Sequence, residues 1–391
     1  MRGNPPLIRK INRQSILRVI EKEFPLSRTE LSRRIGLSLP SVSRIVDSLL
    51  EEKLLREVGK GDSSGGRRPL LLEINADHRY VFGAEISRAT SLVLCDLSGT
   101  IQDRTTVVPD ISRGPLSLAS QLSLEVERMR EKASLPREMI AGVGVGTPGY
   151  LFKSAEHITQ SPFFGWHSID AEEEFSPLFP YPVFIENVAR ASTLAEMIFG
   201  WGREYKTFFY VYLDWGTGGG MVYKGEMVRG RNRASGEFGH MVIERDGIPC
   251  YCGNRGCLEQ YTSTSALSRE VKKRLQKRDG NALPEIDFDW VMQAYEAGNP
   301  MVRDVLVEAG MMLGKGIANV VNVLNPEAVI LGGEISRRCP IYCEEAQSVA
   351  HEHIFSLGAS DTPILRSKGE VDTVALGAAR QAITSYFETL V

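Results

Sequence analysis

The sequence lacks long apolar runs. No segment of the 391 residues approaches the roughly 18 consecutive apolar residues that a membrane-spanning helix needs. The opening residues, Met1 to Lys10, carry charges and two prolines but no apolar run as long as that of a signal peptide. We therefore expect a cytoplasmic protein whose cysteines stay reduced.

Cysteine is scarce as well, with six residues in the chain, yet three of them are clustered. Three thiolates and one imidazole, a full tetrahedral ligand set for zinc, are supplied by His240, Cys250, Cys252 and Cys257. Gly253 and Gly256 allow the positive φ angles of a loop that folds around one ion. Four protein ligands leave no open coordination position, so we predict a structural Zn2+ ion. The alternatives, a redox pair or free surface thiols, leave the histidine without a role.

No excess of one charge marks the whole chain, whose formal net charge is −3, but the two signs are unevenly distributed. Residues 1–76 contain 15 Lys and Arg against 9 Asp and Glu, a net charge of +6. The other 315 residues contain 31 against 40, a net charge of −9. A small basic segment on an acidic body indicates a module that binds a polyanion.

The basic segment has the pattern of a helix-turn-helix. Apolar residues recur at helical spacing in residues 12–24. The run Ser27-Arg28-Thr29-Glu30 has the form of a capping box that opens a second helix, which ends at Gly36. Ser38 is expected to cap a third helix, the recognition helix, whose apolar stripe faces away from DNA. We predict that the DNA-binding residues of this helix are Pro40, Ser41, Ser43, Arg44 and Ser48.

Two short strands, expected over residues 54–58 and 70–74, enclose a glycine-rich loop that ends in Arg67 and Arg68. This arrangement is typical of a winged helix-turn-helix, in which the paired arginines reach phosphates or the minor groove. The alternative is a small protein-binding helical module with a solvated run of charge. We predict DNA binding because the capping box, the glycine turn and the basic wing occur in this order.

From about residue 79 the pattern changes to alternating strands and helices. Short apolar strands are expected at 80–86, 91–96, 101–107 and 140–145, and again at 207–213, 219–223 and 328–331. Two rounds of strands followed by helices, with glycine-rich turns at strand ends, favour a two-lobed α/β body that binds a ligand in a cleft.

The cysteine motif also carries a family resemblance. The run Glu237-x-Gly-His, nine residues, then Cys-x-Cys-Gly-x-x-Gly-Cys-x-Glu259 resembles the signature of the ROK family (repressors, open reading frames and kinases) at every fixed position. Residues 1–76, including the lead-in Asn12-Arg13-Gln14-Ser15-Ile16-Leu17, resemble the DNA-binding domain of ROK repressors, which ROK kinases lack.

The resemblance implies a fold, domain boundaries and a ligand site. The fold is a winged helix-turn-helix followed by a two-lobed α/β body of the actin-like, sugar-kinase type, a duplicated ribonuclease H-like fold. The expected domains are residues 1–76, which bind DNA; 77–195 with the C-terminal helix 372–391, the N-terminal lobe; and 196–371, the C-terminal lobe with the zinc loop and a dimerisation surface. The implied sugar ligands are Asn187, Glu237, His240 and Glu259, beside the loop Gly146-Thr147-Pro148-Gly149.

Three features depart from the pattern of ROK kinases. The general base expected directly after Asn187 is replaced by Val188, which cannot accept a proton. The first phosphate loop, residues 85–88, reads Glu-Ile-Ser-Arg and has no glycine, and the second, residues 214–220, is shorter than in the family. We therefore predict that the chain is not an enzyme.

Together these features predict a ROK transcriptional regulator, a repressor that binds operator DNA as a homodimer and senses a sugar or sugar phosphate. When bound to DNA it would be associated with the nucleoid. One alternative is an active ATP-dependent sugar kinase that also binds DNA, which Val188 argues against. Another is a repressor controlled by a protein partner, such as a sugar-transport subunit, instead of a sugar.

Overall fold

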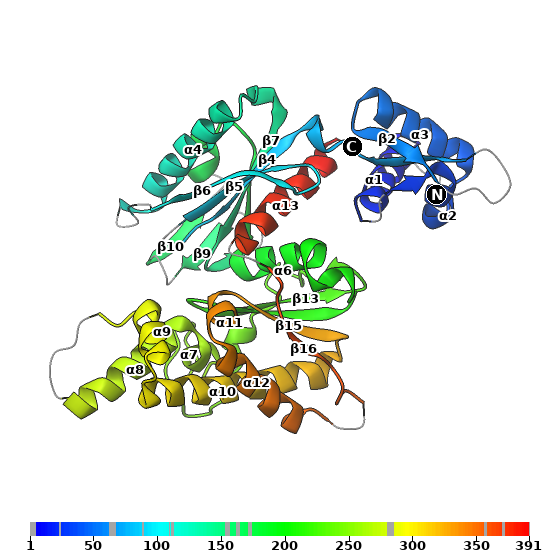
Figure 1. The fold of residues 1–391 in the computed structure, drawn as a ribbon. Coiled ribbons are helices and arrows are strands. Elements are labelled where there is room, and N and C mark those ends of the chain that lie inside the picture. The colour runs from blue at the N-terminus through cyan, green and yellow to red at the C-terminus, as the bar shows by residue number, and fades with distance from the viewer. Residues whose placement is uncertain are drawn as a thin grey trace. The chain divides into compact units, whose positions relative to one another are not determined.

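Figure 1 shows the chain as a computed structural model. The residues that the structure describes are 5–22, 25–61, 68–87, 90–108, 110, 113–152, 157–161, 165–170, 174–279, 285–355, 358–369 and 372–390. The chain forms two compact units. Unit 1 contains Met1–Thr147, Asp170–Glu186 and Ala378–Val391, and unit 2 contains Pro148–Ile169 and Asn187–Gly377. Unit 1 thus includes the whole basic segment, and the predicted boundary at residue 76 stays a prediction.

The basic segment of unit 1 folds as three helices and a small sheet. Its elements are α1 (Pro5–Lys22), β1 (Leu26–Ser27), α2 (Arg28–Ile35), α3 (Leu39–Glu51), β2 (Leu55–Lys60) and β3 (Leu70–Ile74), with the sheet order β1-β3-β2. The predicted capping box is confirmed, because the Glu30 amide donates to Ser27 Oγ (3.3 Å) and the Ser27 amide donates to Glu30 Oε2 (2.8 Å). Gly36 ends α2 at a φ of 72°, as the pattern predicts.

The third helix begins where predicted, but its cap differs from the expectation. Ser38 stands at the N-cap position of α3, yet its side chain makes no capping hydrogen bond. Its Oγ lies 2.9 Å from Ser41 Oγ, so the two hydroxyls satisfy each other instead. The core of this segment consists of fully buried aliphatic side chains, each worth about 1.5–3 kcal/mol of burial free energy. They are Ile16, Leu17, Ile20, Leu31, Val42, Val46, Leu49 and Leu72.

The rest of unit 1 is organised by a five-stranded sheet with the order β11-β7-β4-β5-β6. Its strands are β4 (Tyr80–Glu85), β5 (Thr90–Asp96), β6 (Ile101–Val107), β7 (Ile140–Thr147) and β11 (Val183–Asn187). Strands β4 to β6 form an antiparallel meander, and β7 pairs with β4 in parallel. The helical elements of this part are η1 (Ala76–His78), α4 (Pro115–Lys132), η3 (Arg137–Met139), η4 (Ser176–Leu178) and the C-terminal α13 (Thr373–Thr389).

Unit 2 is organised by a second five-stranded sheet, with the order β14-β13-β12-β15-β16. Its strands are β12 (Phe208–Leu213), β13 (Thr217–Tyr223), β14 (Glu226–Met227), β15 (Ala328–Gly332) and β16 (Ile364–Arg366). Its helices are α6 (Val188–Phe199), η5 (Trp201–Arg203), η6 (Phe238–His240), α7 (Glu259–Thr262), α8 (Thr264–Asp279), α9 (Phe288–Glu296), α10 (Pro300–Leu324), α11 (Glu334–Arg338) and α12 (Pro340–His353). A small sheet has the order β10-β9-β8 and comprises β8 (Tyr150–Phe152), β9 (His157–Ser161) and β10 (Trp166–Asp170).

The two large sheets share one topology. In each, the first three strands form a meander, the fourth strand lies beside the first, and the fifth lies outside the fourth. The predicted duplication of the α/β body is therefore confirmed. Unit 2 has an extensive apolar core, in which buried side chains of β12 and β15 pack with those of α10 and α12. Within the described part of the chain, no helix has both the length and the apolar character needed to cross a membrane.

A close contact between a strand and a helix fixes α13 on the sheet of unit 1. A Cβ atom at Gly144, in the middle of β7, would lie 1.9 Å from the carbonyl oxygen of Ala378. We expect Gly144→Ala to lower the free energy of unfolding by about 1–3 kcal/mol, because backbone must shift to admit the methyl group. Denaturant unfolding measures this change, with Gly358→Ala as the control, since a Cβ at Gly358 meets no atom within 4 Å. Equal stability of the two variants would contradict the packing.

Candidate functional site

The predicted DNA-binding residues lie on the side of α3 that faces away from its buried stripe. Val42, Ile45, Val46 and Leu49 of α3 are buried. Pro40 and Arg44 are exposed, whereas Ser41, Ser43 and Ser48 are half-buried. Ser48 is partly engaged within the segment, because its Oγ donates to Glu52 Oε1 at 2.9 Å.

The predicted wing is only partly described. Arg68 is exposed, at the start of the chain leading into β3, and Arg67 lies outside the described residues. Among the residues predicted to bind DNA, Pro40, Arg44 and Arg68 are therefore exposed in the described part of the chain. An exposed guanidinium on the N-terminal half of such a helix can reach base edges or phosphates.

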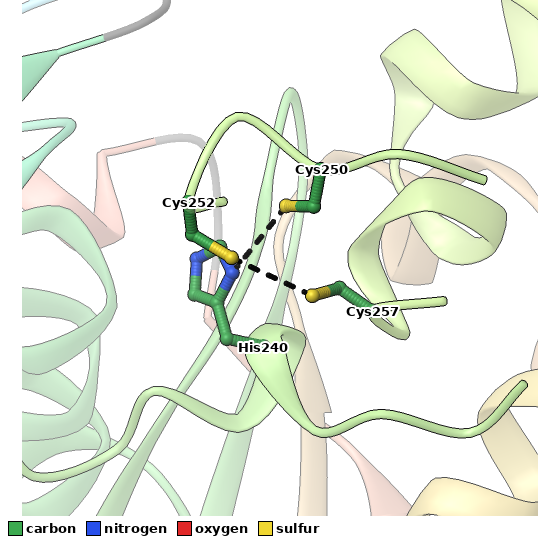
Figure 2. Close-up of side chains that lie close together, drawn as sticks. All are labelled: His240, Cys250, Cys252 and Cys257. Atoms are coloured by element: carbon green, nitrogen blue, oxygen red, sulfur yellow. Dashed lines mark hydrogen bonds between the residues drawn. The ribbon is translucent and has the colours of Figure 1, made fainter. Parts of the chain in front are cut away.

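The four predicted metal ligands come together in unit 2 (Figure 2). His240 ends η6, Cys250 and Cys252 lie in the following loop, and Cys257 precedes α7. One ligand atom from each of the four lies within 4.8 Å of the others. The loop is closed by isolated bridges from Val242 to Cys257 and from Pro249 to Arg255.

Two glycines shape this loop as the sequence predicts. Gly253 has a φ of 94° and Gly256 a φ of 72°, both in the left-handed region. Gly256 is also a position of close approach, because a Cβ there would lie 1.7 Å from the carbonyl oxygen of Glu244. Any other residue at position 256 would push the loop away from Glu244 and separate the ligands.

The distances in the cluster fit tetrahedral coordination. Cys250 Sγ lies 3.6 Å from His240 Nδ1, and Cys252 Sγ lies 3.6 Å from Cys257 Sγ. Metal–sulfur and metal–nitrogen bonds of about 2.3 and 2.0–2.1 Å imply tetrahedral edges of about 3.6 Å between S and N and about 3.8 Å between two sulfurs. The four ligand atoms lie within 4.8 Å of one another, so small side-chain shifts would bring all of them into the first shell of one metal ion.

The electrostatics of the cluster also favour a cation. Burial, together with the neighbouring thiols, raises the pKa of Cys257 to about 12, and burial raises the pKa of Cys250 as well. Burial lowers the pKa of His240, so its imidazole is neutral near pH 7 and can act as a ligand. Thiolates packed this closely repel one another unless a metal ion neutralises them.

Two of the predicted sugar-binding carboxylates are close enough to influence each other. Burial raises the pKa of Glu237 to about 7, Arg190 opposes this rise, and Glu259 adds to it. Part of Glu237 remains open to solvent, although the surrounding protein removes water from its carboxyl group. Glu259, at the start of α7, is buried, and its Oε2 accepts from the Thr217 amide at 2.9 Å.

Asn187 is predicted to bind sugar, and in the ligand-free chain its amide already has partners. It is the N-cap of α6, where its Oδ1 accepts from the amides of Ala189 (2.9 Å) and Arg190 (3.4 Å). Its Nδ2 donates to the carbonyl oxygen of Gly149 at 3.0 Å. The first turn of α6 packs on β13, because a Cβ at Gly218 would lie 2.8 Å from Ala189 Cβ. Strand β13 begins at Thr217, so Asn187 belongs to the same part of unit 2 as Glu259.

Three residues of this site were missed by the sequence analysis. Arg190 is a charged residue in the otherwise apolar and small start of α6 and is buried, a signal that could have been read. Thr217 contributes only its backbone amide, which no sequence pattern reveals. Tyr251 lies between two metal ligands, and its hydroxyl is 3.4 Å from His240 Nε2.

Comparison with known proteins adds to this geometry. The ROK family model matches residues 87–384, and a model of winged helix-turn-helix DNA-binding domains matches residues 9–56. The chain is 30% identical over 387 residues to the xylose repressor of Bacillus spizizenii, which covers 97% of both chains.

Solved structures agree with both parts. The crystal structure of a ROK family transcriptional regulator, a homologue of the E. coli Mlc protein, aligns over 98% of both chains with a TM-score of 0.79 and 26% identity. The ROK hexokinase from Thermus thermophilus aligns over 77% of this chain and 97% of its own, with a TM-score of 0.64 and 26% identity. The kinase thus resembles the α/β body, whereas the regulator spans nearly the whole chain.

Proposed function

This chain belongs to the ROK family, and on that premise we propose that it is a sugar-responsive transcriptional repressor. Its winged helix-turn-helix would bind operator DNA in the cytoplasm, and its body would bind a sugar or sugar phosphate. One observation carries the proposal. The chain combines the exposed start of α3, which carries Arg44, with a body in which Glu237 and Glu259 influence each other electrostatically. That body also contains the cluster of His240 and three cysteines, which can hold a metal ion.

The metal in this proposal is Zn2+, held by His240 and the three cysteines. Three thiolates and an imidazole are ligands that zinc prefers, and four protein ligands exclude water from its coordination shell. The ion would be structural. It would hold the loop between η6 and α7, and thereby fix His240 and Glu259 relative to each other.

The proposed sugar site consists of Asn187, Glu237, His240 and Glu259. Two carboxylates accept hydrogen bonds from hydroxyl groups, and the Nε2 of His240 can donate one when Nδ1 is on the metal. A carboxyl group with a pKa of about 7, as at Glu237, can serve as a hydrogen-bond donor or acceptor near neutral pH, which is consistent with this assignment. Such a site rejects analogues that lack a matching hydroxyl, since its own polar groups would be left unpaired.

The proposal excludes phosphoryl transfer. Val188 occupies the first position of α6, where a ROK kinase would place its base, and its side chain is buried. The carboxylate of Asp214 accepts hydrogen bonds from the amides of Trp215 (2.7 Å) and Glu334. The Trp215 amide, in the second phosphate loop, is therefore already bound to a carboxylate of the protein. Burial, with Glu334 nearby, raises the pKa of Asp214 to about 6. A phosphate would meet these two acids instead of free amides.

A route from body to DNA-binding segment is supported by α13. This helix starts in unit 2 and continues in unit 1. In unit 1, Arg380 Nη1 lies 2.6 Å from Glu21 Oε1 of α1, and both side chains are almost fully buried. Breaking such a buried pair costs free energy, so a displacement of α13 would also displace α1.

A homodimer on a pseudopalindromic operator is the arrangement that lets one winged domain per chain read a full site.

The function is tested by binding measurements on the intact protein. Thermal-shift screening against sugars and sugar phosphates should find a ligand that raises the melting temperature, because binding to the native state stabilises it by mass action. The same ligand should change operator affinity, since a switch needs different ligand affinities in its two states. A ligand that raises the melting temperature without altering operator affinity would contradict the repressor assignment. Complete absence of sugar binding would favour control by a protein partner.

The DNA contact has its own prediction. Replacing Arg44 by alanine should weaken operator binding by about 1–3 kcal/mol if its guanidinium reads a base. Arg128→Ala is a matched control, because Arg128 is exposed on α4, where it forms a surface ion pair with Glu125. Fluorescence anisotropy with labelled operator measures both variants. Equal affinity of Arg44→Ala and the wild-type protein would remove α3 as the reading helix.

A further inference from the structure

Tyr251 occupies an unusual place in the proposed sugar site. It lies between the metal ligands Cys250 and Cys252, yet its side chain turns back onto His240. The two rings meet edge to face, with centroids 5.4 Å apart and an interplanar angle of 85°. The Tyr251 hydroxyl lies 3.4 Å from His240 Nε2 and also hydrogen-bonds the carboxyl group of Glu259.

The two nitrogens of His240 have different partners. Nδ1 is directed at the metal cluster, 3.6 Å from Cys250 Sγ. With Nδ1 on a metal ion, the ring proton is on Nε2, which therefore donates to the Tyr251 oxygen. The Tyr251 hydroxyl can then donate its own proton to the carboxylate of Glu259, which already accepts from the Thr217 amide.

This pattern is what a sugar hydroxyl would make at the same place. A hydroxyl that bridges His240 Nε2 and Glu259 accepts one hydrogen bond and donates another, as the phenol of Tyr251 does. Tyr251 thus contributes one hydrogen bond to each of these two polar groups. A sugar hydroxyl and the phenol cannot occupy one position together.

We propose that the Tyr251 hydroxyl is a built-in substitute for one ligand hydroxyl, and that an effector sugar must displace it to reach His240 and Glu259. This inference rests on the proposed function. Tyr251 is 37% exposed, so part of the residue already faces solvent. Its backbone cannot follow, because it is held between two cysteines of the metal cluster. Displacement is therefore a rotation of the Tyr251 side chain. The rotation costs the free energy of its hydrogen bonds, and only ligands that replace these bonds offset that cost.

The consequence is selectivity for one hydroxyl. A sugar with a correctly placed hydroxyl replaces both hydrogen bonds of Tyr251, so displacement of the phenol costs it little binding free energy. A deoxy sugar that lacks this hydroxyl displaces the phenol without replacing its two hydrogen bonds, so its binding is weaker. Tyr251 thereby makes the site respond to a full hydroxyl pattern and not to general shape.

The test compares Tyr251→Phe with Tyr261→Phe. The first variant removes only the hydroxyl, so sugar no longer competes with it, and affinity should rise by about 5–100-fold, the equivalent of two hydrogen bonds. Tyr261 is the control, because its hydroxyl accepts from the Ile248 amide in the same loop but does not contact His240 or Glu259 in the described residues. Its loss should not tighten sugar binding.

Isothermal titration uses D-xylose, D-glucose and N-acetyl-D-glucosamine 6-phosphate as probes, with zinc content measured for each protein. Unchanged or weaker binding by Tyr251→Phe at full zinc content would overturn the inference, although the proposed function would stand. If none of the probes bound the wild-type protein or the variant, the inference and the sugar-sensing function would both fail.

A second measurement keeps the test decisive if Tyr251→Phe loses zinc. 3-Fluorotyrosine placed at position 251 reports the environment of that ring by fluorine NMR. A saturating probe sugar should move its resonance to that of a solvent-exposed tyrosine, and the 3-fluorotyrosine resonance at position 261 should stay in place. A resonance at position 251 that does not move when sugar binds would show that Tyr251 is not displaced.

Discussion

Replacing Cys257 by serine should release the metal ion and lower the free energy of unfolding by about 4 kcal/mol or more, because loss of a metal is one of the few causes of so large a change. Cys257 is fully buried and lies in the bridge to Val242 that closes the metal loop. Zinc in isolated finger peptides contributes about 10–16 kcal/mol, but here much of unit 2 has its own apolar core, so only part of that energy is lost. Elemental analysis and denaturant unfolding measure the two effects.

The same substitution should also weaken sugar binding. Glu259 follows Cys257 by two residues, and its Oε2 is held by the Thr217 amide only while α7 stays in place. Cys343→Ala provides the matched control, because Cys343 is equally buried but lies outside the cluster. That variant should keep one metal ion per chain and its affinity for sugar. Full metal occupancy in Cys257→Ser would show that the ion is held elsewhere.

The sequence predicted the metal cluster and the winged helix-turn-helix because their signals are local. Four ligands of two types, one histidine and three cysteines, stand at fixed spacing in one short stretch, and Gly253 and Gly256 adopt the positive φ angles expected of them. The capping box of α2 is likewise decided within four residues. Features of this kind need no knowledge of the rest of the chain.

Features that depend on distant packing were not predicted. The helix α12 was missed, because several of the side chains that it buries are small or polar, such as Cys343 and Ala346. It packs against α10 through glycines, since a Cβ at Gly310 would lie 2.6 Å from the Tyr342 carbonyl oxygen. The small sheet β8–β10 and the short strands β14 and β16 were missed as well. Strand β16 pairs with β15, which lies far from it in the sequence, and periodicity alone does not show such a pairing.

The candidate site likewise has features that the sequence predicted and features that it did not. Its carboxylates and histidine stand in the motif, whereas its electrostatics come from residues elsewhere in the chain. Arg190 offsets the charge of Glu237 from another helix, and Thr217 binds Glu259 through its backbone. The role of Tyr251 depends on a side-chain direction that spacing cannot give.

The wild-type protein should show no sugar-kinase activity, because two separate requirements of phosphoryl transfer are unmet. The acceptor hydroxyl needs a base, a group that contributes about 10²–10⁴-fold in rate, and Val188 cannot supply it. The nucleotide phosphates need free backbone amides, and Asp214 and Glu259 already accept from those of Trp215 and Thr217. The two defects act on different steps of the reaction, so their effects on the rate multiply.

Val188→Asp should therefore fail to restore a useful kinase. The new carboxylate would stand beside Asn187 at the start of α6, where a base can reach a bound sugar, but the amides near Asp214 would stay occupied. Adding Asp214→Gly to Val188→Asp should still give no useful turnover, because Glu259 would keep the Thr217 amide and residues 85–88 would still lack a glycine. An assay that couples ADP release to each bound sugar measures all three proteins. Wild-type turnover at about 1–100 per second, the ordinary kinase range, would instead identify an active kinase that also carries a DNA-binding domain.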